Sequence, residues 1–365
     1  MKMVSAKTAL VRRSVLRTEG NSWVGRCNYW LETNSSNSRE FVAKVGVRQP
    51  LILTGHGVNL RVEKGALLVR DGFTHYPQKQ RTWRFFPGEW RLPSRIVVVD
   101  VDGGLSFAAL AWLSEHNISL VQINWRGDVI NIVSANAEKT ISERVRSQIV
   151  ERNKDGGLGI GIKLIQQKIL NSIGTLQHVF PSSLKTDQIV TRLSNELRTL
   201  KAKPPSSISH LLGIEGRAGS AYFGAWRESN VKWEGVDRYP IPDDWHRIGQ
   251  RSSKLASKSR PNKSATHPIH AMLNYAYGIL ESRVRMQVAA LGLDPTIGIF
   301  HGNFRGKHGL VFDLMEPLRP IFDRQVLQFV QGRTFQPDDF VIARNGSCRL
   351  NPELARNVVR LVAEF

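Results

Sequence analysis

IGIKLIQQKILNSIGTLQHV, residues 160–179, decides the fold class, because its apolar side chains recur three and four positions apart, as on one face of a helix. The expected stripe comprises Ile162, Leu164, Ile165, Ile169 and Leu170. TISERVRSQIVERNK (140–154) and DQIVTRLSNELRTLKAK (187–203) continue the same period, and two prolines at 204 and 205 end the last segment. The C-terminal part of the chain is therefore predicted to be helical.

A further helix is predicted within residues 266–295, with Pro268 in its first turn and Gly292 as its stop signal. Its apolar stripe consists of Ile269, Met272, Leu273, Ala276, Leu280 and Val284.

Strand patterns precede the helical part. Residues 51–72 alternate apolar and polar side chains around Lys64 and Gly65, which predicts a hairpin. RIVVVDV (95–101), ISLVQINW (118–125) and DVINIV (128–133) are further strand candidates, and FAALAWLSEH (107–116) is a short helix capped by Ser106. The predicted fold class is α+β, with an N-terminal β-rich domain followed by an all-α domain.

Gly103 and Gly104 lie between a strand and a helix start, where backbone amides can bind a phosphate. The pattern matches neither GxGxxG nor GxxxxGK[ST], however. A tight strand-to-helix turn needs the same glycines, and this structural interpretation is favoured over an anion site.

Three segments follow from these patterns. Residues 1–47 form an N-terminal extension without a sustained period, 48–137 the β-rich domain and 138–365 the helical domain. A polar, basic and flexible loop is predicted at about 236–265, either as a phosphate-binding segment or as a solvated surface loop.

The chain carries 51 Lys and Arg against 31 Asp and Glu, a net charge of +20, which favours a polyanionic partner. Charge alone does not distinguish an enzyme from a passive nucleic-acid-binding module. Cys27 and Cys348 are far apart, which argues against a disulfide framework or a structural zinc site and fits a reducing cytoplasm. No apolar run has the length that a bilayer requires, so no membrane association is expected.

Acidic residues and one histidine in the C-terminal half are candidate ligands for Mg²⁺ or Mn²⁺, which prefer oxygen-rich sites. Glu215 is surrounded by small residues, which let another segment approach its carboxylate, although it could also be an ordinary helix-terminal Glu. Asp313 and Glu316 are three residues apart and could face one cation, but this spacing is also that of a capping box.

His301 follows the apolar run TIGIF and precedes the basic stretch GNFRGKHG. It could face a metal ion while Arg305 and Lys307 contact phosphates, or it could be a satisfied structural histidine. His308 is the competing candidate, and the sequence alone does not choose between the two. Arg319, and more weakly Tyr222, are the other candidate phosphate contacts near the site.

Three segments in this order resemble the CRISPR-associated spacer-acquisition integrase, the first-numbered Cas protein family. ISHLLGIEGRAGSAYFGAW (208–226) resembles its first catalytic motif, HPIHAMLNYAYGIL (267–280) its central helix, and GLDPTIGIFHGNFRGKHGLVFDLMEPLRPIFD (292–323) its His and acidic motifs. Weaker similarity extends the resemblance over about residues 48–345.

The resemblance implies a β-rich dimerisation domain joined to a helical catalytic domain, in a homodimer that assembles with a small ferredoxin-like partner. It places the metal ligands on Glu215, His301 and Glu316, and an accompanying acidic residue on Asp313. The implied cofactor is Mg²⁺ or Mn²⁺. The implied reaction is insertion of double-stranded DNA with 3′ ends (a prespacer) into target repeat DNA by 3′-hydroxyl transesterification.

Alternatives remain at this point. The family commonly has Asn where His270 stands, so any contact made by that side chain is in doubt. A casposase, which moves transposons with the same domain, and a solo family member are alternatives. A casposase usually carries an added C-terminal DNA-binding domain. Because this chain ends at Phe365, the CRISPR integrase is favoured over the casposase. The alternative from another class is a non-catalytic DNA-binding assembly protein.

Overall fold

The computed structural model describes residues 49–73, 80–134, 140–227, 229–249, 265–301, 308–344 and 346–363. The predicted extension, residues 1–47, lies outside these ranges.

Six strands form one sheet in the order β3-β2-β1-β4-β5-β6. Their bounds are β1 Leu51–Glu63, β2 Ala66–Arg70, β3 Thr82–Phe85, β4 Arg95–Leu105, β5 Ser119–Ile123 and β6 Val129–Val133. β4 pairs in parallel with both β1 and β5, and the other pairs are antiparallel. Lys64 and Gly65 turn the β1–β2 hairpin with φ of 50° and 77°, the left-handed conformation that a tight two-residue turn requires. The predicted hairpin is confirmed.

The glycine pair does not form the predicted turn. Gly103 and Gly104 are part of β4, where they pair with Val58 and Asn59 of β1. A Cβ atom on Gly103 would lie 1.8 Å from the carbonyl oxygen of Val58, so close backbone approach requires glycine there. Helix α3 (Phe107–Glu115) begins after this strand, and Ser106 caps it by accepting a hydrogen bond from the Ala109 amide.

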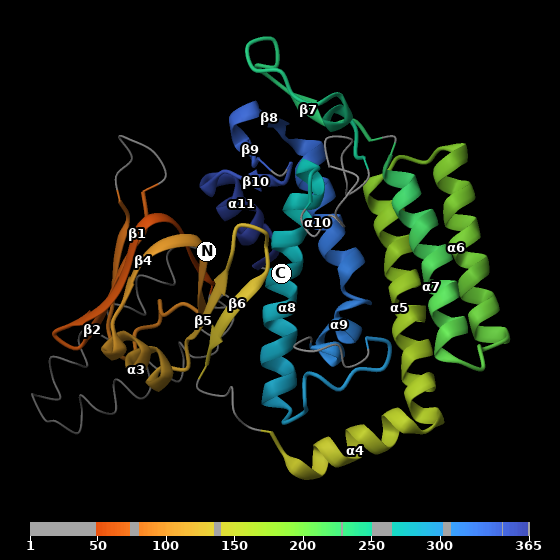
Figure 1. Ribbon diagram of the computed structural model, residues 1–365, viewed down its shortest axis with the longest axis horizontal. Coiled ribbons are helices and arrows are strands. Elements are labelled where there is room, and N and C mark those ends of the chain that lie inside the picture. Colours follow the sequence, from red (N-terminus) through yellow and green to blue (C-terminus); the bar gives the residue numbers. More distant parts are fainter. Residues whose placement is uncertain are drawn as a thin grey trace, which may run out of the picture. The chain divides into compact units, whose positions relative to one another are not determined.

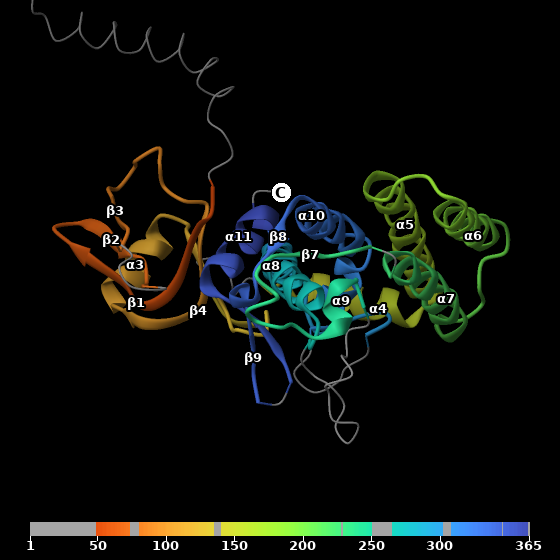
Figure 2. The same ribbon diagram turned by 90° about the horizontal axis from the view of Figure 1, so that it is seen from above.

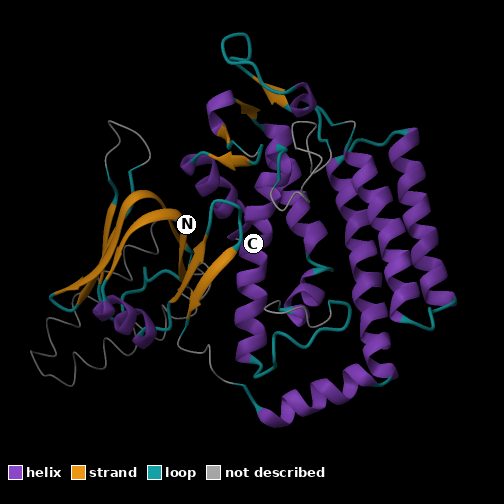
Figure 3. Cartoon of the chain, in the orientation of Figure 1, coloured by secondary structure: helices purple, strands orange, loops and turns teal. Residues whose placement is uncertain are grey.

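Eight further helices make the C-terminal part of the described chain largely helical (Figure 3). They are α4 Ser142–Asn153, α5 Asp155–Val179, α6 Leu184–Ala202, α7 Ile208–Trp226, α8 Pro268–Ala290, α9 Gly309–Met315, α10 Arg319–Gly332 and α11 Pro352–Ala363. Helices α5, α6 and α7 lie side by side (Figures 1 and 2), and α8 packs against α9, α10 and α11. The predicted α+β class is confirmed.

The expectation of an all-α second domain needs a correction, because short strands occur among its helices. β7 (Lys232–Trp233) pairs with β8 (Thr334–Phe335), and β9 (Phe340–Ile342) pairs with β10 (Cys348–Leu350). Two short 3₁₀ turns, η1 (Asp243–His246) and η2 (Pro337–Asp339), accompany them. Of the loop expected at 236–265, residues 250–264 lie outside the described ranges. Trp245 in the described portion is buried and stacks on Trp233.

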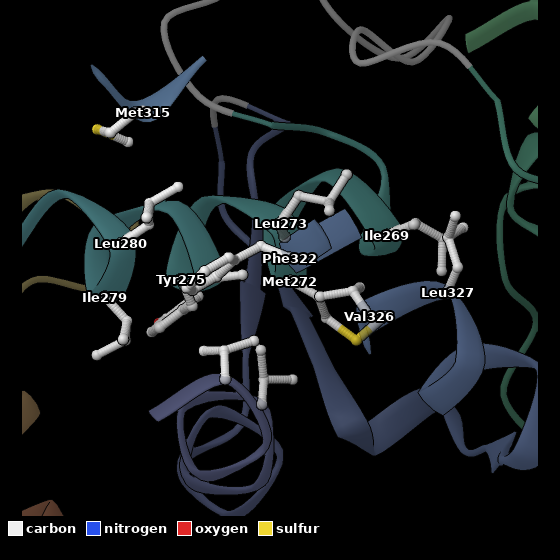
Figure 4. Close-up of a cluster of buried hydrophobic side chains, with 14 of the residues drawn as sticks. Ile269, Met272, Leu273, Tyr275, Ile279, Leu280, Met315, Phe322, Val326 and Leu327 are labelled. Atoms are coloured by element: carbon white, nitrogen blue, oxygen red, sulfur yellow. The ribbon is translucent and has the colours of Figure 1, made fainter. Parts of the chain in front are cut away.

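The stripe predicted for α8 is confirmed, because every one of its residues is buried. Figure 4 shows Ile269, Met272, Leu273 and Leu280 of this helix in one buried cluster with Phe322 and Val326 of α10. In α5 the prediction is partly wrong. Ile165 and Ile169 are buried, but Leu170 is 49% exposed, and the buried face continues instead through Ile173 and Leu176.

A buried ion pair joins α11 to the sheet. Arg356 donates to the Asp71 carboxylate at 2.8 Å and to the Thr54 hydroxyl at 2.6 Å. The Tyr275 hydroxyl of α8 donates to the Trp125 carbonyl, just beyond β5, at 2.9 Å. These contacts fix α8 and α11 against the sheet. No helix among the described residues is long and apolar enough to span a membrane.

Candidate functional site

Glu215 lies within α7 and not at its end, so the helix-terminal interpretation is wrong. Ser207 caps this helix by accepting a hydrogen bond from the His210 amide. Glu215 Oε1 contacts the ammonium of Lys168, which projects from the neighbouring helix α5. The packing of α5 against α7 therefore holds the Glu215 carboxylate next to a positive charge that lies 47 positions earlier in the sequence.

Glu316 lies between α9 and α10 and is only 4% exposed. Its Oε2 atom is 2.5 Å from the same Lys168 ammonium, and its Oε1 atom is 2.9 Å from the Arg319 guanidinium. Burial acts to raise the pKa of Glu316, but the charges of Arg319 and Lys168 and the Lys168 hydrogen bond outweigh it and lower the pKa. Glu316 is therefore held as a carboxylate. Glu215 and Glu316, which share Lys168, are called the carboxylate pair below.

Asp313 does not form the capping box that its spacing to Glu316 suggested. It lies within α9, is fully buried, and accepts hydrogen bonds from the backbone amides of Ile299, Phe300 and His301. Its Oδ1 atom is also 2.7 Å from the His301 Nδ1 atom. The carboxylate therefore fixes both the backbone before His301 and the orientation of the imidazole ring.

His301, and not His308, is the histidine that Asp313 orients. The His301 side chain is 44% exposed, and its charge is among the smaller influences that lower the pKa of Glu316. When the ring is neutral, a proton on Nδ1 is donated to this carboxylate and the lone pair stands on Nε2. His308 is the residue preceding α9, and burial lowers its pKa.

The sequence patterns did not identify Lys168. Within the described ranges, no three His, Cys, Asp or Glu side chains lie close enough together to hold a metal ion. The carboxylate pair nevertheless converges on a single cation, the Lys168 ammonium. Two carboxylates and a histidine oriented by a third carboxylate are a donor set that suits Mg²⁺ or Mn²⁺. The chemistry of these residues therefore fits the metal ion that the resemblance implies.

A cavity of 470 Å³ adjoins the carboxylate pair, and Lys168, Glu215, Tyr222, Arg319 and Asp323 contribute to its lining. At one wall Asp323 accepts hydrogen bonds from the hydroxyls of Tyr277 at 2.5 Å and Tyr222 at 3.0 Å. These three residues are called the tyrosine cluster. Burial raises the pKa of Asp323 to about 7, although both tyrosine hydrogen bonds act to lower it.

The candidate DNA contacts differ in their placement. Arg319 pairs with Glu316, and its guanidinium lies 5.2 Å from the centre of the Tyr277 ring. Tyr222 is 3% exposed with its hydroxyl bonded to Asp323, which favours a structural role over a phosphate contact. Arg305 and Lys307 lie outside the described residues.

The ring of His270 also lines the cavity, and its Nε2 atom is 3.0 Å from the Gly249 carbonyl oxygen.

Sequence comparison matches residues 51–364 to the family described as CRISPR associated protein Cas1. The CRISPR-associated endonuclease Cas1 1 of Archaeoglobus fulgidus is 26% identical over 327 residues, which cover 86% of this chain and 87% of that protein. The corresponding endonuclease of Francisella tularensis subsp. novicida is 26% identical over 285 residues, 76% of this chain and 78% of that protein.

Solved structures share the fold. A casposase bound to an integration product aligns with a TM-score of 0.66 at 24% identity, over 86% of this chain and 82% of that one. A chain of a Cas6-RT-Cas1–Cas2 complex aligns with a TM-score of 0.60 at 19% identity, over 87% of this chain and 32% of that one.

Proposed function

The chain belongs to the CRISPR associated protein Cas1 family, and from this premise we propose that it is a metal-dependent DNA endonuclease and integrase that inserts spacers into a CRISPR repeat array. The observation that carries the proposal is the convergence of Glu215 and Glu316 on one cation beside an oriented histidine. Curated relatives of this chain are named Cas1 endonucleases.

The proposed reaction is a transesterification. The oxygen of a DNA 3′-hydroxyl loses its proton and forms a new bond to a target phosphorus, the target's own P–O3′ bond breaks, and the leaving 3′-oxygen takes up a proton. With water as the nucleophile the same site hydrolyses DNA. When bound, Mg²⁺ or Mn²⁺ supplies charge neutralisation at the phosphate and lowers the pKa of the attacking hydroxyl.

The residues of this chain have separate tasks. Glu215, Glu316 and Nε2 of His301 would hold the metal ion. Asp313 keeps the imidazole in the orientation that leaves Nε2 available, through the 2.7 Å contact to Nδ1. Arg319, already 2.9 Å from Glu316, is placed to contact a phosphate oxygen next to the same ion. No covalent protein intermediate is required.

Partner proposals follow from the family and from charge. The net charge of +20 suits a prespacer duplex with 3′ ends and a target repeat. We propose a homodimer that forms through the β-rich segment and assembles with a small ferredoxin-like partner. A fold relative occurs in a complex whose name includes Cas2, which is consistent with such an assembly.

A strand-transfer assay tests the function. The full chain is incubated with a 3′-ended duplex, a supercoiled plasmid bearing a repeat array, and Mn²⁺, with and without the small partner. Joined product from the parent chain and its loss in Glu215→Gln are expected. The control is Glu196→Gln. Glu196 of α6 pairs with Arg217 of α7 outside the site, so this variant removes a carboxylate without touching the carboxylate pair.

Two outcomes would overturn this proposal. DNA binding without joining under all metals and targets would favour a non-catalytic assembly protein. Equal joining by the parent and Glu215→Gln would remove the site assignment. If joining occurs at a target other than a repeat, the length of the duplication and the sequence at the insertion point identify a casposase-type integrase.

A further inference from the structure

Lys168 occupies the position between the carboxylate pair that a bound cation would take. Its ammonium contacts Glu215 Oε1 and Glu316 Oε2, and its side chain is 17% exposed. Glu316 is almost completely buried, where two close carboxylates need positive charge beside them, and it has the Arg319 guanidinium as a second partner at 2.9 Å. The lysine therefore neutralises two acidic groups that would otherwise repel each other.

The side chain of Lys168 can take a second position, in the adjoining cavity. It lines the 470 Å³ cavity together with Arg319 and Arg227, and its flexible four-carbon stem allows the ammonium to move while α5 stays in place. In the cavity the ammonium would meet two guanidinium groups, which is unfavourable without an anion. A DNA phosphate supplies that anion.

We propose that Lys168 is the built-in counter-cation of the carboxylate pair and couples metal binding to DNA binding. This inference rests on the proposed function. In the free protein the ammonium competes with a divalent ion for Glu215 and Glu316. When DNA binds, a phosphate attracts the ammonium away from the carboxylates, so DNA raises the affinity for the metal ion, and the metal ion raises the affinity for DNA by the same factor.

A purely structural role for Lys168 leads to a different expectation. If the lysine only held α5, α7 and the Glu316 segment together, its removal would loosen the carboxylates and weaken metal binding. Under the coupling proposal, its removal takes away the one cation that both carboxylates share, leaves Arg319 on Glu316, and strengthens metal binding. The two roles therefore predict opposite signs for the change in metal affinity.

The test measures free Mn²⁺ by electron paramagnetic resonance during titration of the full chain, with and without a 3′-overhang duplex. Lys168→Met is expected to bind Mn²⁺ about 10-fold more tightly than the parent without DNA, within the usual range for coupled sites. DNA should raise the Mn²⁺ affinity of the parent several-fold and that of Lys168→Met by a clearly smaller factor, because in the variant only the phosphate next to the ion contributes. The matched control is Lys163→Met, an exposed lysine on the same helix that should behave as the parent.

Folding is checked by thermal melting with and without Mn²⁺. Lys168→Met is expected to show a larger Mn²⁺-induced rise in Tm than the parent, because the ion replaces the missing ammonium. If Lys168→Met does not fold, Lys168→Gln, which can still hydrogen-bond a carboxylate, carries the same two expectations. Unchanged or weaker Mn²⁺ binding in a folded variant, or DNA coupling equal to that of the parent, would overturn the proposal.

Glu215→Gln and Glu316→Gln separate this inference from the proposed function. If both bind Mn²⁺ as the parent does, the metal site itself is misassigned. If both lose Mn²⁺ while Lys168→Met gains nothing, only the coupling role of Lys168 fails.

Discussion

Two buried carboxylates in this protein, Glu316 and Asp323, have pKa values that are shifted in opposite directions. Glu316 faces the cations Lys168 and Arg319, which lower its pKa in spite of burial. Asp323 faces the neutral hydroxyls of Tyr222 and Tyr277, and burial raises its pKa to about 7. The difference shows that burial alone does not decide the charge of a carboxylate, because a partner's full charge stabilises the ionised form more than a hydroxyl does. The carboxylate pair therefore carries the negative charge that a bound cation needs, whereas the tyrosine cluster is a hydrogen-bonded group that supports one wall of the cavity.

The largest expected effect tests the first half of this comparison. Glu316→Gln keeps the shape of the side chain and removes its charge, so strand transfer should fall about 1000-fold, equivalent to about 4 kcal/mol. Binding of duplex DNA should change by less than about 3-fold, because it depends on many dispersed Lys and Arg contacts. Single-turnover joining and a filter-binding titration measure the two quantities. A parallel loss of both would contradict the separation of chemistry from binding.

The second prediction concerns the pH dependence of stability at Asp323. A raised pKa in the folded state means that its contribution is fully present below the unfolded value of 3.8 and is lost as the pH rises through about 7. Each unit of pKa shift corresponds to about 1.4 kcal/mol. Asp323→Asn, which is uncharged at every pH, should therefore gain stability relative to the parent as the pH rises from about 4 to about 7. Denaturant unfolding at several pH values measures this, and a constant difference would contradict it.

Glu316 should act with the opposite sign on the acid side. Because its folded pKa lies below 4.5, its contribution is present above that pH and is lost as the pH falls through the folded value. The same unfolding series on Glu316→Gln should therefore show its smallest difference from the parent at the lowest pH.

The fourth prediction addresses the orientation of His301. Asp313→Asn keeps one acceptor oxygen but loses the charge that fixes the imidazole, so strand transfer should fall about 10- to 100-fold, as for other groups that orient metal ligands. Higher Mn²⁺ concentration should restore part of the rate. Mn²⁺ dependence of the joining rate measures this effect, and a rate loss that is unaffected by Mn²⁺ would point to a collapsed loop instead.

The smallest effect is expected at Tyr222. Tyr222→Phe removes one hydrogen bond to Asp323 and should destabilise the fold by about 1 kcal/mol with DNA affinity unchanged. Thermal unfolding and DNA titration check the two parts. A clear loss of DNA affinity would restore Tyr222 as a DNA contact, the role for which its closeness to Glu215 in the sequence makes it a weak candidate.

Much of the fold could be predicted from local patterns. The α8 stripe and the β1–β2 hairpin were predicted correctly because burial period and turn chemistry are local properties. Leu170 was misassigned because a run of adjacent apolar residues does not show which one faces the core. Gly103 was misplaced because its constraint comes from the backbone of Val58, 45 positions earlier in the chain.

The candidate site could be predicted only in part. Glu215, His301, Asp313 and Glu316 stand out through motifs, but Lys168 acquires its role only from Glu316, 148 positions away. The capping-box interpretation of Asp313 failed because the amides of residues 299–301, not the start of its own helix, are its partners. Asp323 carries only a weak signal in the sequence, an acidic residue directly after the apolar pair Ile321 and Phe322.

The central claim is that Glu215 and Glu316 share one divalent ion with His301. The most direct measurement is a crystal structure of the protein with Mn²⁺ and a 3′-ended duplex, with the ion located by its anomalous scattering. We predict one peak about 2.0–2.3 Å from an oxygen of each carboxylate and from His301 Nε2, with the Lys168 ammonium moved to a phosphate. A peak elsewhere, or no peak while Lys168 still bridges both carboxylates, would contradict the claim.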